Sequence, residues 1–307
     1  MVLSQPVCKG CGQPIWGNYF TALGGTWHPE HFVCAACGHP ITDASFNVYQ
    51  GAPYHAACYA NQVALKCAYC GKPLLGEYFV DSWGTAYCKQ HQQEYPSCAY
   101  CGRLVPPAQQ EQLSTGSSEA IRCPICRASA IEDVAEAKPL FAQVKQWVSS
   151  QGLVYNNLPL SLELCDRARL ATLLKERNQV HSLGATTSST YTQNGRVMRA
   201  EIGGVAVLRG LPATLFQGVT VHELGHVWLI VHGIENLPSW AEEGFCELLS
   251  YRFYTAMNTP ESRHQALTTE QNTDPVYGDG FRRVRARADA LGFSRFLDIL
   301  RTTKRLP

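Results

Sequence analysis

The sequence lacks a long apolar segment and an excess of charge of either sign. No stretch approaches the roughly 20 residues that a helix needs to cross a bilayer, and no basic region followed by an apolar run marks a signal peptide. The 26 basic and 25 acidic residues leave a formal net charge of +1, which favours neither nucleic acid nor an anionic membrane as a partner. These absences predict a cytoplasmic protein that binds neither membrane nor nucleic acid.

Cysteine is scarce in the second half of the chain. Of the 14 cysteines, only Cys165 and Cys246 lie beyond Arg127, and both are predicted to be buried core thiols. The other cysteines form pairs with two residues between their members, which is the spacing of metal ligands rather than of disulfides in a small secreted protein.

These pairs, some of which contain histidine, combine in order into four sets of four zinc ligands. The first block of the chain gives two sets, which are Cys8, Cys11, His28 and His31, then Cys34, Cys37, His55 and Cys58. The second block gives two more, which are Cys67, Cys70, Cys88 and His91, then Cys98, Cys101, Cys123 and Cys126. Because each set fills a tetrahedral shell, these four zinc ions are predicted to be structural.

The first block resembles a LIM domain, because the segment from Trp27 to Cys34 bridges its two ligand sets. The second block repeats the first, with Gly76–Phe79 and Trp83 parallel to Gly17–Phe20 and Trp27. However, six residues separate His91 from Cys98 where a LIM domain has two. We therefore expect a LIM domain over residues 1–63, a LIM-like double zinc module over 64–129 and a third domain over 130–307. Such modules generally recognise other proteins.

The most informative segment of the third domain is His222-Glu-Leu-Gly-His226, within a predicted helix from Pro212 to Gly233. Two histidines four residues apart lie on one helix face and can bind a single zinc ion, with Glu223 as general base toward a zinc-bound water. Gly218, one turn earlier on this face, predicts open space for a substrate. The alternative is a pair of surface histidines on an ordinary amphipathic helix.

A second predicted helix follows, with Ser239 as its N-cap. Its Trp240-x-x-Glu243-Gly244 pattern resembles that of gluzincin metallopeptidases, which implies Glu243 as the third zinc ligand. Glu247, one turn further on, is expected to hydrogen-bond the outer nitrogen of a ligating histidine. The alternative is a solvated acidic face that includes Glu242, Glu243 and Glu247.

The remaining sequence pattern predicts that the third domain is mainly helical and gluzincin-like, with a small sheet. We therefore expect the chain as a whole to be α+β. A helix is expected from Val134, a strand over 160–164, a helix over 167–176 and a hairpin over 189–208 that turns at Asn194-Gly195. The strand over 201–208 is predicted to be the sheet edge on which an extended peptide could lie.

A short basic run near the C-terminus contains Arg282, Arg283, Arg285 and Arg287. A nucleic-acid patch is one interpretation of this run. The spacing favours a solvated helix face instead, with a buried side formed by Phe281, Val284, Ala288 and Leu291.

Nearly the whole chain resembles the ubiquitin-activated LIM metallopeptidases that restrict organ growth in plants, the DA-one family. The resemblance rests on the domain order and on Gly210-Leu-Pro before the histidine motif, Glu242-Glu-Gly after it and Tyr277-Gly-Asp-Gly-Phe-Arg near the end. It implies a zinc endopeptidase that cleaves regulatory proteins, with ubiquitin or ubiquitinated proteins as partners. The LIM modules would recognise substrates or regulate the enzyme.

By this resemblance, His222, His226 and Glu243 hold one catalytic zinc ion in addition to the four structural ions, and Glu223 is the general base. The candidate donors to the oxyanion are Tyr251, Tyr254, Tyr277 and His181, and Tyr277 is favoured because it lies in the Tyr-Gly-Asp-Gly stretch that carries the resemblance. Alternatively, the glycines beside Tyr277 mark a helix start that Asp279 caps. The competing function is that of a LIM-type adaptor with a non-catalytic peptidase-like domain.

Overall fold

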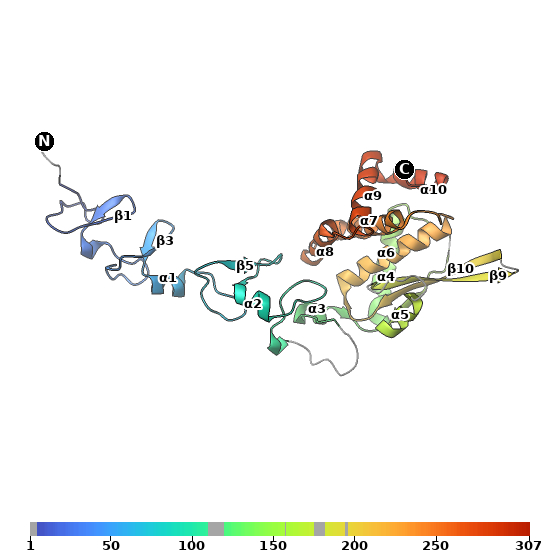
Figure 1. Cartoon of the computed structure of the whole chain (residues 1–307), viewed down its shortest axis with the longest axis horizontal. Coiled ribbons are helices and arrows are strands. Elements are labelled where there is room, and N and C mark those ends of the chain that lie inside the picture. The colour runs from blue at the N-terminus through green and yellow to red at the C-terminus, as the bar shows by residue number, and fades with distance from the viewer. Residues whose placement is uncertain (1–4, 110–119, 157, 175–181, 194–195) are drawn as a thin grey trace. The chain divides into compact units, whose positions relative to one another are not determined.

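The computed structural model describes residues 5–109, 120–156, 158–174, 182–193 and 196–307, with the backbone alone for the strand residues between 187 and 203. It divides into two compact units, Met1–Pro96 and Ser97–Pro307. The first consists of short hairpins and the second of helices around a small sheet, so the architecture is α+β (Figure 1). No helix of the described residues is long and apolar enough to cross a membrane.

The first unit contains three two-stranded hairpins. They pair β1 (Phe20–Ala22) with β2 (Gly25–Trp27), β3 (Asn47–Tyr49) with β4 (Ala52–Tyr54), and β5 (Tyr78–Val80) with β6 (Ala86–Cys88). The short helices are η1 (Pro29–His31), α1 (Ala56–Gln62) and α2 (Lys89–Glu94). A cluster of only three buried residues, Phe32, Cys34 and Ile41, lies under the first hairpins. Such a small core needs metal to be stable.

The hairpins of the two blocks correspond, as the sequence predicts, but the residue equivalent to Trp27 is not the predicted one. Trp27 precedes the ligand His28 and pairs with Phe20. In the second block Tyr87 precedes Cys88 and pairs with Phe79, whereas Trp83 lies in the turn. The expected match of Trp83 to Trp27 is therefore wrong, because the second hairpin has a longer turn.

The second unit starts with short elements and continues with helices that surround a three-stranded sheet. In order, these elements are η2 (Pro107–Gln109), α3 (Pro124–Ala128), β7 (Ala130–Ile131), α4 (Val134–Ser150), β8 (Leu162–Cys165), α5 (Arg167–Leu174), β9 (Gly184–Gln193), β10 (Arg196–Leu208), β11 (Leu211–Pro212), α6 (Ala213–Val231), α7 (Ser239–Met257), α8 (Pro260–Gln271), α9 (Gly278–Leu291) and α10 (Phe293–Thr303). The strands and helices expected from the sequence are present. Residues 175 and 176 of the predicted 167–176 helix and the predicted turn of the β9–β10 hairpin at Asn194-Gly195 lie outside the described residues.

The sheet order corrects the predicted substrate edge. β10 lies in the middle, because β8 pairs with it in parallel and β9 pairs with it antiparallel. The strand over 201–208 therefore has β9 along one side and, from Val205 to Leu208, β8 along the other, so this part of the strand cannot accept a peptide. β9 is an outer strand of this sheet, and its first residues, Gly184 to Thr186, line the cavity described below.

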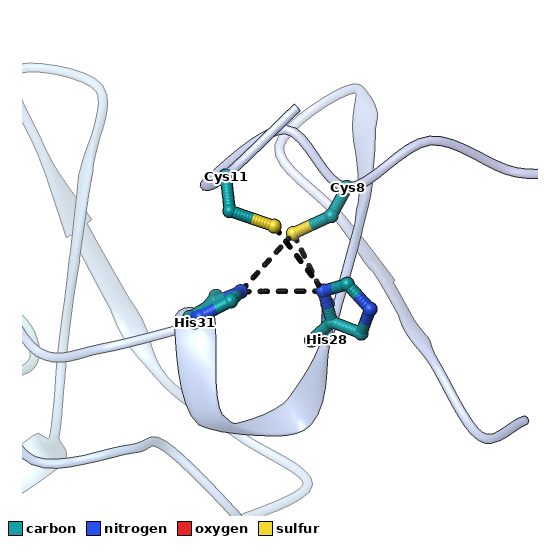
Figure 2. Close-up of side chains that lie close together, drawn as sticks. All are labelled: Cys8, Cys11, His28 and His31. Carbon is teal, nitrogen blue, oxygen red and sulfur yellow. Dashed lines mark hydrogen bonds between the residues drawn. The ribbon is translucent and has the colours of Figure 1, made fainter. Parts of the chain in front are cut away.

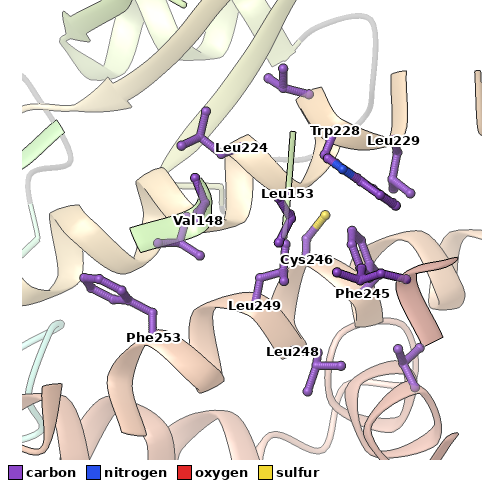
Figure 3. Packing of buried hydrophobic residues seen from close by; sticks show 14 of the residues in the cluster. Val148, Leu153, Leu224, Trp228, Leu229, Phe245, Cys246, Leu248, Leu249 and Phe253 are labelled. Carbon is purple, nitrogen blue, oxygen red and sulfur yellow. The ribbon is translucent and has the colours of Figure 1, made fainter. Parts of the chain in front are cut away.

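The main core lies between α6 and α7. Figure 3 shows Leu224 and Trp228 of α6 on one side of the cluster and Leu249 and Phe253 of α7 on the other. Cys246 lies among them, and Cys165 is buried in the neighbouring cluster, so both leftover thiols are core residues as predicted. Because α6 is apolar on nearly all sides, it is buried along most of its length.

Helix ends and faces follow the sequence with two exceptions. α6 ends before Gly233, whose φ of +62° suits a residue just past a helix. The N-cap of α7 is Pro238 rather than Ser239, which is already the first helical residue. On α9, Phe281, Val284 and Ala288 are buried as predicted, whereas Leu291, the last residue of the helix, is only partly buried.

The basic run on α9 makes contacts within the protein. The guanidinium of Arg283 lies 3.5 Å from the ring centroid of Trp240, and that of Arg285 bonds Glu270 at 2.7 Å. Arg282 donates to the backbone oxygens of Glu270 and Asn272. These contacts fasten α9 to α7 and α8, which favours a structural role for the run over a nucleic-acid patch.

Candidate metal centre and active site

The first predicted zinc set comes together between the Cys8–Cys11 pair, which precedes β1, and the two histidines that follow β2 (Figure 2). Cys11 Sγ lies 3.5 Å from His28 Nδ1, Cys8 Sγ lies 3.6 Å from His31 Nδ1, and the two Nδ1 atoms are 3.2 Å apart. Four donor atoms thus converge on one point, which is the arrangement that a tetrahedral zinc site requires.

Local electrostatics favours a thiolate at Cys8. Burial would raise the pKa of this thiol, but the backbone N–H groups of His28 and Gly10 donate to the sulfur at 3.3 and 3.4 Å. With the further hydrogen bonds around it, these contacts lower the pKa of Cys8 to about 5. A deprotonated sulfur is the form that binds zinc.

The other three cysteine-containing sets also bring their donor atoms within 4.8 Å of one another. In the second set, the outer nitrogen of His55, Nε2, faces the backbone oxygen of Pro40 at 3.2 Å, which orients the ring. In the third set, His91 is buried, neither ring nitrogen has a hydrogen-bond partner, and Nδ1 lies 3.6 Å from Glu94 Oε2. Buried polar atoms are rarely left unpaired, so this environment fits a histidine that binds a metal through one ring nitrogen. All four cysteines of the fourth set are buried.

A fifth set of donors lies at the crossing of α6 and α7. His222 Nε2 and His226 Nε2 are 3.2 Å apart, and Glu243 Oε2 lies 3.1 Å from the first and 3.5 Å from the second. The four-residue spacing on α6 aligns the two rings, and α7 supplies the carboxylate. These three residues are those assigned from the sequence.

The outer nitrogen of each histidine is held by a second carboxylate of α7. His222 Nδ1 lies 3.2 Å from Glu247 Oε1, which confirms the contact expected from the sequence. His226 Nδ1 lies 2.9 Å from Glu242 Oε1, a contact that the sequence did not suggest. Glu242 enters the sequence-based expectations only in the alternative of a solvated acidic face, and this contact argues against that alternative. Such outer contacts fix the orientation of metal-binding rings.

This cluster concentrates negative charge around the buried ring of His226 and the partly buried ring of His222. Burial would lower the pKa of His222, but Glu243 and Glu247 raise it well above its ordinary value. Burial would likewise raise the pKa of Glu243, which the two histidines hold well below its ordinary value. A positive charge is therefore favoured between the rings and Glu243. A divalent cation bound between neutral histidines would supply that charge.

Cys246 is a further donor near the histidines, within 4.8 Å of a ring nitrogen of each. Its sulfur lies on the core side of α6, and a Cβ atom built on Gly225 would be only 2.9 Å from it. Burial raises the pKa of this thiol, which disfavours the thiolate. Glu243 is the better third donor, because its Oε2 atom lies 3.1 and 3.5 Å from the two Nε2 atoms and the histidines lower the pKa of its carboxyl group.

The fifth set opens into a cavity of about 510 Å³ whose lining includes Glu223 and Tyr277. Glu223 is only 6% exposed, and its Oε2 atom accepts a hydrogen bond from Thr186 Oγ1 at 2.9 Å. The open space expected beside Gly218 is instead filled by a tyrosine. A Cβ atom at this glycine would lie 1.8 Å from Tyr254 Oη, so Gly218 makes room for a wall residue of the cavity.

Two regions of the chain match known protein families. A LIM-domain model matches residues 8–63, and a family model described as Protein DA1 matches residues 156–270, which include the fifth donor set. Protein DA1-related 1 of Arabidopsis thaliana is 27% identical over 99% of this chain and 66% of its own length. LIM domain-containing protein HDR3 of Oryza sativa subsp. japonica is 26% identical over 98% and 74%, and Protein DA1 of Arabidopsis thaliana is 24% identical over 98% and 68%. The two models and the three relatives together support membership in the DA1 family.

The DA1 family model ends at residue 270, before the tyrosine that the sequence proposes as oxyanion donor. Tyr277 and Tyr254 both line the cavity, whereas the hydroxyl of Tyr251 donates to Glu270 at 2.7 Å. Burial and the negative charge of Glu243 raise the pKa of Tyr277, which keeps its phenol protonated and able to donate. His181 lies outside the described residues.

The two glycines that follow Tyr277 allow α9 to approach its neighbours closely. A Cβ atom at Gly278 would lie 1.9 Å from the backbone oxygen of Asn272, and one at Gly280 would lie 2.2 Å from that of Trp240. The helix start expected at these glycines is present, because α9 begins at Gly278, but Asp279 lies inside the first turn and pairs with Arg282 rather than capping the helix. The approach brings Tyr277 to the α7 turn that carries Glu243.

Replacing Gly280 by alanine is expected to destabilise the second unit, because the added methyl group would force α9 away from α7. Overpacking of this kind costs about 1–3 kcal/mol, or a melting temperature lower by roughly 3–10 °C. Asp279→Ala, in the same turn but exposed, should cost less than about 1 kcal/mol. Thermal unfolding of both variants checks this, and equal losses would contradict the close-approach explanation.

Proposed function

We propose that this chain is a zinc-dependent endopeptidase that cleaves protein substrates. The observation that carries the proposal is the convergence of His222, His226 and Glu243 within 3.5 Å of one another, in a cavity that also contains Glu223. The DA1 family relationship supports the proposal without specifying the reaction.

Those three residues would hold the metal. When bound, zinc supplies a Lewis acid that polarises a peptide carbonyl and lowers the pKa of water. Glu223 takes a proton from the attacking water and delivers it to the nitrogen of the departing amine. The phenol of Tyr277 donates a hydrogen bond to the carbonyl oxygen as it gains negative charge.

The LIM and LIM-like modules are assigned to recognition of protein partners, with ubiquitin or ubiquitinated proteins as the class that the family resemblance suggests. Large apolar side chains on the first unit are exposed, among them Trp16 at 78% and Leu75 at 60%. Such side chains commonly anchor protein interfaces. The reduced, metal-type cysteine sets favour a cytoplasmic setting.

Zinc content tests the proposal. The full chain loaded with zinc is expected to hold five ions per molecule, and His226→Ala is expected to hold four, because only the fifth set loses a donor. His232→Ala, a matched control at the end of the same helix, should keep five. Four ions in all three proteins by elemental analysis would favour the adaptor function instead.

A further inference from the structure

The first residues of β9 lie directly against Glu223, although they are far from it in sequence. Thr186 is 8% exposed, and its Oγ1 atom lies 2.9 Å from Glu223 Oε2 and 3.0 Å from the backbone oxygen of the same residue. One hydroxyl hydrogen is thus placed between the carboxylate and the helix backbone that carries it.

Gly184, two residues earlier on β9, provides the space that the Glu223 side chain occupies. A Cβ atom at this position would lie 2.9 Å from both Cγ and Oε1 of Glu223 and 2.8 Å from Cγ1 of Val219. Any other residue would therefore push the carboxylate or the adjacent turn of α6 aside. Gly184 and Thr186 together form a cradle for this one side chain.

The cradle is rigid because the sheet holds it. Thr186 pairs with Val205 of the central strand β10, and Val205 pairs on its other side with Leu162 of β8. A β-branched side chain has few rotamers, so the Thr186 hydroxyl has little freedom of its own. A glutamate side chain left to itself samples many rotamers, and a hydrogen bond to an ionised oxygen removes most of that freedom.

We propose that Thr186 is a positioning residue for proton transfer by Glu223. It holds Oε2, which restricts rotation of the carboxylate and so fixes where Oε1 lies relative to the metal ligands on the same helix. The inference rests on the proposed peptidase function. A small displacement of a catalytic group costs a large part of its contribution to rate, so the loss of this one hydroxyl should be measurable.

The test compares Thr186→Val, which has the same shape without the hydroxyl, and Thr186→Ser, which keeps it. Each is made in the full chain, loaded with zinc and assayed on fluorescein-labelled casein beside Glu223→Gln. We expect Thr186→Val to lower kcat about 10- to 100-fold with KM within about twofold and zinc content unchanged. Thr186→Ser should stay within about threefold of the wild type. Full kcat in the valine variant, or equal loss in both variants, would overturn the proposal.

Crystal structures of the wild type and Thr186→Val provide a second readout that does not depend on activity. The wild type should show the Thr186 hydroxyl within hydrogen-bond distance of the Glu223 carboxylate, and the valine variant should show that carboxylate displaced or in several conformations. A wild-type structure with the hydroxyl bonded elsewhere would overturn the positioning role. An inactive wild type with the hydrogen bond intact would count against the peptidase function alone.

Discussion

Replacing Glu223 by glutamine is expected to lower the rate of peptide hydrolysis by at least about 100-fold without changing the zinc content. Glutamine has the shape of glutamate, so it fits beside Gly184 and its amide oxygen can accept from Thr186. It cannot take a proton from water. The variant therefore separates proton transfer from folding and metal binding.

The assay uses the zinc-loaded full chain with fluorescein-labelled casein, with and without ubiquitin. Glu235→Gln is the matched control, because Glu235 is exposed just beyond α6 and should not affect cleavage. Cleavage by Glu223→Gln at the wild-type rate would exclude Glu223 as the base. Partner binding without cleavage in either protein would favour the LIM-type adaptor.

A chain that starts at Ser97 is expected to fold, whereas one that starts at Ala130 is expected to be severely destabilised. The reason is that the fourth zinc set belongs to the second unit. Gln265 on α8 donates to the backbone oxygen of Tyr100 at 2.9 Å, and Arg122 donates to that of Gly210 at 3.1 Å. Tyr100 also packs against the second core cluster.

The shorter fragment would lose these contacts and the hydrogen bond from the backbone nitrogen of Ala213 to the oxygen of Ser129 at the start of α6. With the metal set also gone, we expect a loss of several kcal/mol, or a melting temperature lower by roughly 10 °C or more. Thermal unfolding of both fragments measures this difference. Melting temperatures within about 3 °C of each other would show that residues 97–129 do not support the helical domain.

This division also determines how autoregulation by the LIM modules should be tested. In a fragment that starts at Ala130, a change in cleavage rate could result either from removal of an inhibitory module or from loss of the fourth metal set. The fragment that starts at Ser97 removes three ligand sets and leaves intact every contact described for the second unit. Its cleavage rate relative to the full chain measures the effect of residues 1–96 on activity.

The sequence predicts residue sets well where covalent spacing dictates geometry. Two ligands separated by two residues must converge, and two histidines four apart on a helix must share a face, so the donors on α6 come together as expected. Glu247 also follows, because it lies one turn beyond Glu243 on the same helix. Each of these relations is local along the chain.

The sequence does not predict contacts between elements that are far apart along the chain. β10 is central rather than at the edge because β8 pairs with its outer side, and nothing in the strand itself specifies this. The space expected at Gly218 is taken by Tyr254 from α7, and Thr186 reaches Glu223 only once β9 packs on α6. The contact between Glu242 and His226 depends on how α7 packs on α6, which the spacing of residues along α7 does not specify.

Anomalous diffraction at the zinc absorption edge, from crystals of the zinc-loaded full chain, would locate every ion directly. Five peaks are expected, with the fifth between the Nε2 atoms of His222 and His226 and Oε2 of Glu243, beside Glu223. Four peaks at the cysteine-containing sets, with none between α6 and α7, would contradict a zinc peptidase.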